Sequence, residues 1–132
     1  MEFDVDRLIA AATAAREKAY APYSGFKVGA AVVTASGEMF RGCNVENLSY
    51  GLANCAERVA IGSAVAAGER EFAGLVVVAD TREPVSPCGA CRQVMVEFGD
   101  FPLVLATLKG VRFETTVGEM LPRGQTGILD RE

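Results

Sequence analysis

The sequence has 132 residues, half of them hydrophobic, and a formal net charge of −4 at pH 7. This is the length of one domain with a sizeable core, so we expect residues 1–132 to form a single domain. No apolar run is long enough to span a membrane, and no stretch has the charged start and apolar centre of an export signal, which favours a cytoplasmic protein. An acidic balance also argues against nucleic acid as a partner, because proteins that bind it present a basic patch. These features favour a small-molecule substrate.

The first third of the chain predicts a helix followed by a β-hairpin. Apolar residues recur at helical intervals over 4–19, and Asp4 can cap the start of that helix. The segments 26–34 and 39–45 have the pattern of two strands joined by a turn at Ser36-Gly37. Because both faces of the first strand are apolar, we expect both to be covered by other elements.

The middle of the chain predicts helices that alternate with a buried strand. A helix is expected over 55–67, and the apolar run 75–79 is typical of a central strand covered on both faces. Ser86 and Pro87 are residue types suited to the N-cap and the first position of a second helix, which would end near Phe98.

The last third completes a mixed sheet. The order strand, helix, strand implies that 75–79 and 103–108 pair in parallel through a right-handed crossover. Only Lys109-Gly110 separates 103–108 from the next strand, 111–117, so these two must form an antiparallel hairpin. The expected fold is therefore an α/β, three-layer α/β/α sandwich with a mixed five-stranded sheet whose last strand is antiparallel.

Three of the four cysteines have the spacing of a zinc site. Cys88 and Cys91 stand at i and i+3, which brings both sulfur atoms to one face of a helical turn, and Cys55 begins another predicted helix. Three protein ligands on tetrahedral zinc leave a fourth position for water, which is the layout of a catalytic site. Glu57 follows the first ligand by two residues and is placed to move the protons of that water. We therefore predict one catalytic zinc ion per chain.

Each part of this pattern has an alternative reading when taken alone. The C-x-x-C segment could be a redox pair, and Asn54 with Glu57 could be a capping box. The fourth cysteine, Cys43, is expected on the apolar side of its strand, where it would be a small core residue and not a ligand. Asn44 and Glu46 would point together to the other side. Their polar groups suit sugar hydroxyls, although a solvated strand end fits the same pattern equally well.

Four motifs resemble those of the small, homotetrameric, three-cysteine cytidine deaminases, and the resemblance spans nearly the whole chain. The motifs are YAPYSGFKVGAA at 20–31, GCNVEN at 42–47, CAER at 55–58 and PCGACRQ at 87–93. Zinc deaminases of nucleobases carry H-x-E followed by P-C-x-x-C. This chain has no histidine, so Cys55 would take the place of the first ligand. The short hairpin before the last strand fits family members that act on free nucleosides.

The resemblance implies hydrolytic, zinc-dependent deamination of cytidine or 2′-deoxycytidine in pyrimidine salvage. It implies zinc ligands at Cys55, Cys88 and Cys91 and a proton carrier at Glu57. Three thiolates on Zn²⁺ leave a net charge of −1, which the helix N-termini would offset and which Arg58 could offset by hydrogen bonding to a thiolate. The resemblance also implies substrate contacts: Asn44 and Glu46 would hold the ribose, and Phe26 would pack against the pyrimidine. The backbone of Ala56 and the Ser86 region would contact the edge of the base. Tyr50 would help close a pocket shared with a neighbouring subunit of a homotetramer.

One segment departs from the family pattern. Family members carry an aromatic residue shortly after a Leu-Pro near the C-terminus, which reaches over the base in another subunit, whereas no aromatic residue follows Leu121-Pro122 here. Three other functions stay open. A deaminase of another aminopyrimidine, such as blasticidin S, would not need Asn44 and Glu46 for a ribose. A polynucleotide-editing deaminase is disfavoured by the acidic balance and the hairpin, and a non-enzymatic zinc or redox module would have no use for Glu57.

Overall fold

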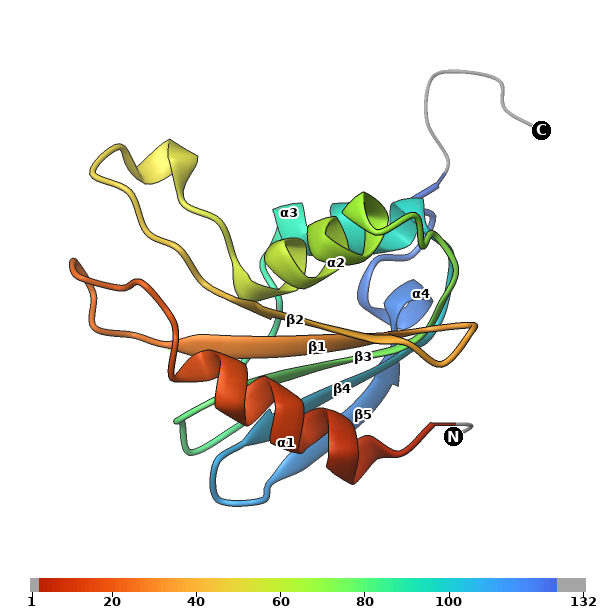
Figure 1. The fold of residues 1–132 in the computed structure, drawn as a ribbon, viewed down its shortest axis with the longest axis horizontal. Helices are drawn as coiled ribbons and strands as arrows, with labels where there is room; N and C mark the ends of the chain where they lie inside the picture. The colour runs from red at the N-terminus through yellow and green to blue at the C-terminus, as the bar shows by residue number, and fades with distance from the viewer. Residues whose placement is uncertain (1–2, 126–132) are drawn as a thin grey trace.

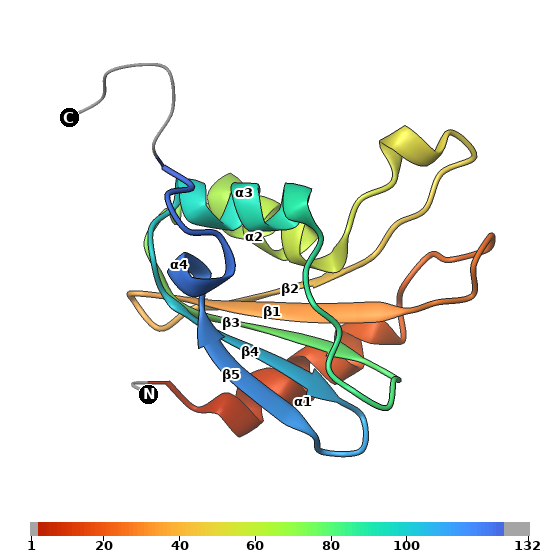
Figure 2. The ribbon, with the colours of Figure 1, turned by 180° about the vertical axis from the view of Figure 1, so that it is seen from behind.

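In the computed structural model, which describes residues 3–125, five strands form one sheet in the order β2-β1-β3-β4-β5, with helices on both faces (Figures 1 and 2). The predicted three-layer α/β/α arrangement is confirmed. The elements in chain order are α1 (Val5–Arg16), β1 (Val28–Thr34), β2 (Met39–Cys43), the 3₁₀ turn η1 (Tyr50–Leu52), α2 (Ala56–Ala66), β3 (Phe72–Ala79), α3 (Gly89–Glu97), β4 (Pro102–Thr107), β5 (Arg112–Thr116) and α4 (Val117–Met120).

The directions of the strands decide where a site can form. As predicted, β3 and β4 are parallel and β5 returns antiparallel to β4. Strand β1 is antiparallel to both β2 and β3, so β2 and β3 point the same way and end at one edge of the sheet, opposite Gly29 and Val28 respectively. The chain after each of these two strands leads to the N-terminus of a helix, α2 or α3. In open α/β sheets this edge, at the carboxyl ends of the strands, is where ligands bind.

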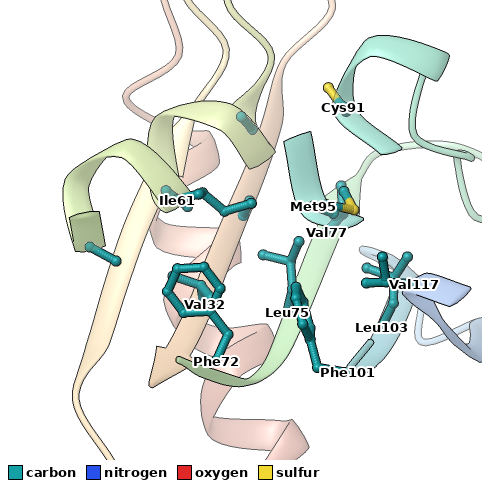
Figure 3. Packing of buried hydrophobic residues seen from close by; sticks show 14 of the residues in the cluster. Val32, Ile61, Phe72, Leu75, Val77, Cys91, Met95, Phe101, Leu103 and Val117 are labelled. Carbon is teal, nitrogen blue, oxygen red and sulfur yellow. The ribbon is translucent and has the colours of Figure 1, made fainter. Parts of the chain in front are cut away.

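Two hydrophobic layers hold the helices on the sheet. Alternate residues of β1, β3 and β4 face α1 on one side and α2 with α3 on the other, and these three strands are almost wholly buried. Figure 3 shows the second layer, where Ile61 of α2 and Met95 of α3 point towards Leu75 and Leu103 of the sheet. Each large side chain of this kind contributes about 1.5–3 kcal/mol when it is fully buried.

Glycines set how closely the helices approach the sheet. A Cβ atom built on Gly42 of β2 would overlap the backbone of Ala56 and Ala60, so α2 can lie directly on β2 only because residue 42 has no side chain. In β3, Gly74 lies under the ring of Phe3. Gly74 is near the start of β3. The described chain therefore begins at the opposite side of the sheet from the carboxyl ends of β2 and β3 (Figure 1).

Several element boundaries differ from the prediction for identifiable reasons. Asp4 caps α1 as expected, but the helix ends at Arg16, because the next three amides bond to carbonyls only three residues back. Strand β1 begins at Val28 and not at residue 26, because the side chain of Asn44, and not a neighbouring strand, bonds to the backbone there. Within residues 3–125, none of the helices is both long enough and apolar enough to cross a membrane.

Candidate active site

The three predicted cysteine ligands converge at the sheet edge described above. The Sγ atoms of Cys55, Cys88 and Cys91 all lie within 4.8 Å of one another. Three thiols that converge in this way match the sulfur donor set of zinc sites, so the residues present fit the predicted ion. Cys43 is half-buried and lies outside this cluster of the described residues, as expected for a cysteine that is not a ligand.

Two helix N-termini position the ligands. Cys55 is the N-cap of α2 and Cys88 is the N-cap of α3. The prediction of Ser86 as the N-cap and Pro87 as the first helical residue is therefore wrong by two residues. The reason is that the sulfur of Cys88 accepts a hydrogen bond from the amide of Cys91 at 3.4 Å. The sulfur thus caps the helix in the way that a serine hydroxyl would. Both helix dipoles place positive charge at the thiols.

Arg58 contacts the sulfur of Cys55, in agreement with the prediction that it could hydrogen-bond to a thiolate. Its Nη2 donates to Sγ of Cys55 at 3.5 Å and to the carbonyl of Ala53 at 3.4 Å, while its buried Nε has no partner among the described residues. A hydrogen bond from Cys91, together with Arg58, lowers the pKa of Cys55 to about 5. The same bond between the two thiols raises the pKa of Cys91. The surroundings thus favour a thiolate at Cys55 even before a metal binds.

Glu57 is a buried carboxyl beside the ligands. It lies in the first turn of α2 and is 4% exposed. Burial, which disfavours the charged carboxylate, raises its pKa above the ordinary value. A carboxyl group whose pKa is raised in a cleft is suited to take up and release protons.

A cavity of about 270 Å³ joins the ligands to most of the predicted substrate residues. Cys55, Glu57 and Cys88 contribute to its wall. The predicted contacts that also line it are Phe26, Asn44, Glu46, Ala56 and Ser86. The sequence did not single out three apolar lining residues, Val28, Val77 and Val85, because valine in or beside a strand is indistinguishable from core.

Asn44 and Glu46 are held by the segment before β1 and not by a strand ladder. The side-chain oxygen of Asn44 accepts from the amide of Val28 at 2.8 Å, and its nitrogen donates to the carbonyl of Phe26 at 2.8 Å. Glu46 accepts from the amides of Tyr23 at 2.9 Å and Ser24 at 3.2 Å, and from the hydroxyl of Ser24. The hydrogen bond from this hydroxyl lowers the pKa of Glu46, so the carboxylate stays ionised.

Tyr50 lies apart from this cavity within the chain. It is 80% exposed on η1, near the tip of a loop that projects from the sheet edge (Figure 1), where it lines a second cavity of about 290 Å³ with Tyr23 and Glu46. Leu48 and Leu52 on the same loop are 79% and 65% exposed.

The segment after β5 is attached to α3. Arg92, next to the ligand Cys91, donates to the carbonyl of Pro87 at 2.9 Å and to that of Met120 at 3.0 Å. Gln93 donates to the carbonyl of Gly124 at 3.1 Å. The departure from the family pattern after Leu121-Pro122 extends past residue 125, and that part lies outside the described residues.

A family model, curated relatives and solved structures that resemble this chain all indicate the same family. Residues 3–107 match the family model described as the cytidine and deoxycytidylate deaminase zinc-binding region. The chain is 55% identical to a cytidine deaminase from Sporosarcina psychrophila, over 90% of this chain and 89% of the relative. It is similar to a solved structure of a cytidine deaminase from Burkholderia pseudomallei, with a TM-score of 0.88 and 58% identity over 91% of this chain and 98% of that one. A blasticidin-S deaminase from Bacillus cereus is 35% identical over 72% of this chain and 74% of its own length.

Proposed function

Because the chain belongs to the cytidine and deoxycytidylate deaminase family, we propose that it converts cytidine, 2′-deoxycytidine or both to the corresponding uridine and ammonia, as a zinc-dependent hydrolase of pyrimidine salvage. The observation that carries this proposal is one cavity in which two thiol ligands and the buried Glu57 face the polar pair Asn44 and Glu46. Reacting and orienting groups for a small nucleoside are thus collected in one place.

Cys55, Cys88 and Cys91 would hold one zinc ion per chain. When bound, zinc supplies Lewis acidity that brings the pKa of a water molecule towards neutrality. Arg58 hydrogen-bonds the sulfur of Cys55 and, with the N-termini of α2 and α3, offsets the negative charge of three thiolates.

Glu57 moves the protons of the reaction. It takes a proton from the attacking water and delivers it to N3 of the pyrimidine, which makes C4 electrophilic. The oxygen of that water bonds to C4, and Glu57 then carries its remaining proton to the 4-amino group, which leaves as ammonia as the C4 carbonyl forms. Its burial and raised pKa support this role, because the group must be able to hold a proton between the two transfers.

The remaining lining residues orient the nucleoside. We assign the ribose to Asn44 and Glu46, the face of the pyrimidine to Phe26, and the base edge to the backbone of Ala56 and the Ser86 region. All five line the cavity, and Asn44 is fixed by two hydrogen bonds to backbone that leave its remaining donor and acceptor for a ligand.

We also propose a homotetramer in which Tyr50 completes the pocket of a neighbouring subunit. The exposed apolar side chains Leu48, Tyr50 and Leu52 on one projecting loop support an interface there, because exposed apolar side chains gathered in one place mark interaction surfaces. Light scattering should then give a mass near four times the 13.9 kDa of the chain. A stable and fully active monomer would contradict the assembly and leave Tyr50 without a role.

An absorbance assay for loss of the 4-amino group tests the activity. Cytidine, deoxycytidine, free cytosine and blasticidin S should be compared at equal concentration, and a nucleoside should be turned over fastest. Preference for blasticidin S would favour the alternative suggested by the 35% identical relative. If the protein binds zinc but releases ammonia from none of the four compounds, the result would favour the alternative of a non-enzymatic zinc module.

We further propose one domain over residues 1–132 and a cytoplasmic location. The described secondary structure belongs to a single sheet and its covering helices. Ligation by three thiolates requires reduced cysteines, which a reducing compartment maintains.

A further inference from the structure

Ser24 lies where the segment before β1 meets the acidic residue of the cavity. Its hydroxyl donates to Oε2 of Glu46 and accepts from the amide of Phe26 at 3.0 Å. Because the Phe26 amide already occupies a lone pair of the hydroxyl, the single hydroxyl proton is directed to the carboxylate. The amide of Ser24 also donates to Oε1 of Glu46, so both oxygens of the carboxylate are held by one residue.

These bonds use most of the acceptor capacity of Glu46. A carboxylate has about four lone-pair sites. The amides of Tyr23 and Ser24 take two on Oε1, and the hydroxyl of Ser24 takes one on Oε2. The arrangement leaves one site, on Oε2, for a hydroxyl group of a ligand. The other three bonds hold the direction of that site, since Glu46 is only half-buried and few packing contacts restrain its carboxylate.

We infer that Ser24 is a positioning residue for nucleoside binding, which acts through Glu46 by aiming its free lone pair at a hydroxyl on the sugar ring. The inference rests on the proposed function, because it takes Glu46 as the residue that binds the sugar. Removal of the Ser24 hydroxyl frees Oε2 and lets the side chain of Glu46 sample other rotamers, and binding must then restrict those rotamers again. The cost falls on binding, since Glu57 and the cysteines are not contacted by Ser24 in the hydrogen bonds described.

The lowered pKa of Glu46 is consistent with this picture, because a hydrogen bond from Ser24 stabilises the charged carboxylate, and a charged acceptor binds a hydroxyl more strongly than a neutral one. Geometry still carries the inference, since Ser24 connects the segment that bears Phe26 with the one that bears Glu46.

The test compares Ser24→Ala with the wild-type enzyme, both loaded with zinc, on cytidine and on 2′,3′-dideoxycytidine. The second substrate lacks the 2′- and 3′-hydroxyls, so its sugar ring offers Glu46 no hydroxyl to bind. We expect the KM for cytidine to rise roughly three- to tenfold, the range of one lost hydrogen bond, with kcat changed less than about twofold. The kcat/KM for dideoxycytidine should stay at the wild-type value, and Ser24→Thr, which retains the hydroxyl, should restore the KM for cytidine.

Ser36→Ala is the matched control. The hydroxyl of Ser36 donates to Glu69 at 2.7 Å at the turn between β1 and β2, so the variant removes a serine–glutamate bond of the same kind away from the cavity. It should leave both substrates unaffected. A double-mutant cycle adds a second readout, because in a Glu46→Gln background Ser24→Ala should have little further effect on the KM for cytidine.

Three results would overturn the inference: an unchanged KM for cytidine in Ser24→Ala, an equal loss on both substrates, or a full Ser24→Ala effect that persists in the Glu46→Gln background. If Ser24→Ala does not fold, Ser24→Cys replaces it under the same criteria, because a thiol keeps a similar volume and is a weak donor. Failure of the proposed function has a different signature, since the wild-type enzyme itself would then release no ammonia from cytidine, and this inference would fall with it.

Discussion

The contact of α2 with β2 through Gly42 makes a sharp prediction about stability and metal binding. In Gly42→Ala the new Cβ would meet backbone atoms of Ala56 and Ala60, which cannot swing aside as the end of a side chain can. Overpacking in a well-packed interior costs about 1–3 kcal/mol, and we expect the upper end of that range here. For a chain of this length about 3 kcal/mol corresponds to a fall in melting temperature of roughly 10 °C.

The same displacement should reach the metal ligands. Ala56 follows the N-cap Cys55 directly, so a shift of the first turn of α2 moves Cys55 relative to Cys88. Gly62→Ala is the matched control, because Gly62 lies in the same helix and a Cβ built there meets no described atom within 4 Å. Alanine in place of an unconstrained helical glycine should stabilise the protein by about 0.5–1 kcal/mol.

Both variants should be unfolded thermally and in urea, followed by circular dichroism, at one protein concentration and with excess zinc, because association and metal binding both shift apparent stability. Zinc per chain should be measured on the same samples. Wild-type stability of Gly42→Ala, or equal destabilisation by Gly62→Ala, would refute the reasoning that residue 42 must lack a side chain for α2 to pack.

Three further predictions concern the metal centre. Glu57→Gln should keep one zinc per chain by metal analysis but lose roughly two to four orders of magnitude in rate, and retained turnover would remove Glu57 from its role. Arg58→Gln should slow deamination at full zinc occupancy, and adding Cys55→His should restore part of the rate. The two effects should not be additive, because the two side chains are in contact. A wild-type rate for Arg58→Gln would show that Arg58 is only structural. Arg92→Met frees the carbonyl of Pro87, next to a ligand, and should speed the loss of zinc to a chelator severalfold, whereas an unchanged release rate would show that this bond does not hold the ligand loop.

The parts of the fold that follow from local pattern were predictable from the sequence. The two residues Lys109-Gly110 are too few for any connection but a hairpin. Cys88 and Cys91 are three residues apart, which places both sulfur atoms on one face of a helical turn. Both predictions depend only on neighbours along the chain, and both are confirmed by the antiparallel pairing of β4 with β5 and by the cluster of sulfur atoms.

The parts of the fold in which a side chain makes a hydrogen bond expected of another residue or of a strand were not predictable in the same way. Cys88 caps α3 with its sulfur, so the helix begins later than Ser86 and Pro87 indicated. Asn44 bonds to backbone that was predicted to belong to a strand. Ser24 stands in the motif at 20–31, but nothing in the sequence indicated its bond to Glu46, because the two residues are 22 positions apart and only the folded chain brings them together. Sequence patterns show which faces are apolar, but not which polar side chain will satisfy a particular backbone group.

The position of Phe3 over Gly74 has a practical consequence for attaching the enzyme to a support. A tether joined ahead of Phe3 would leave the molecule from the sheet edge opposite the cavity, so that the loops at 20–27 and 44–55 face the solution (Figure 1). The described chain also ends away from the cavity, because the side chain of Gln125 donates to the carbonyl of Val96 near the last turn of α3, whereas Cys91 lies in the first turn. For an immobilised catalyst or a sensor surface, coupling through the amino end therefore keeps the cavity open to nucleosides arriving by diffusion.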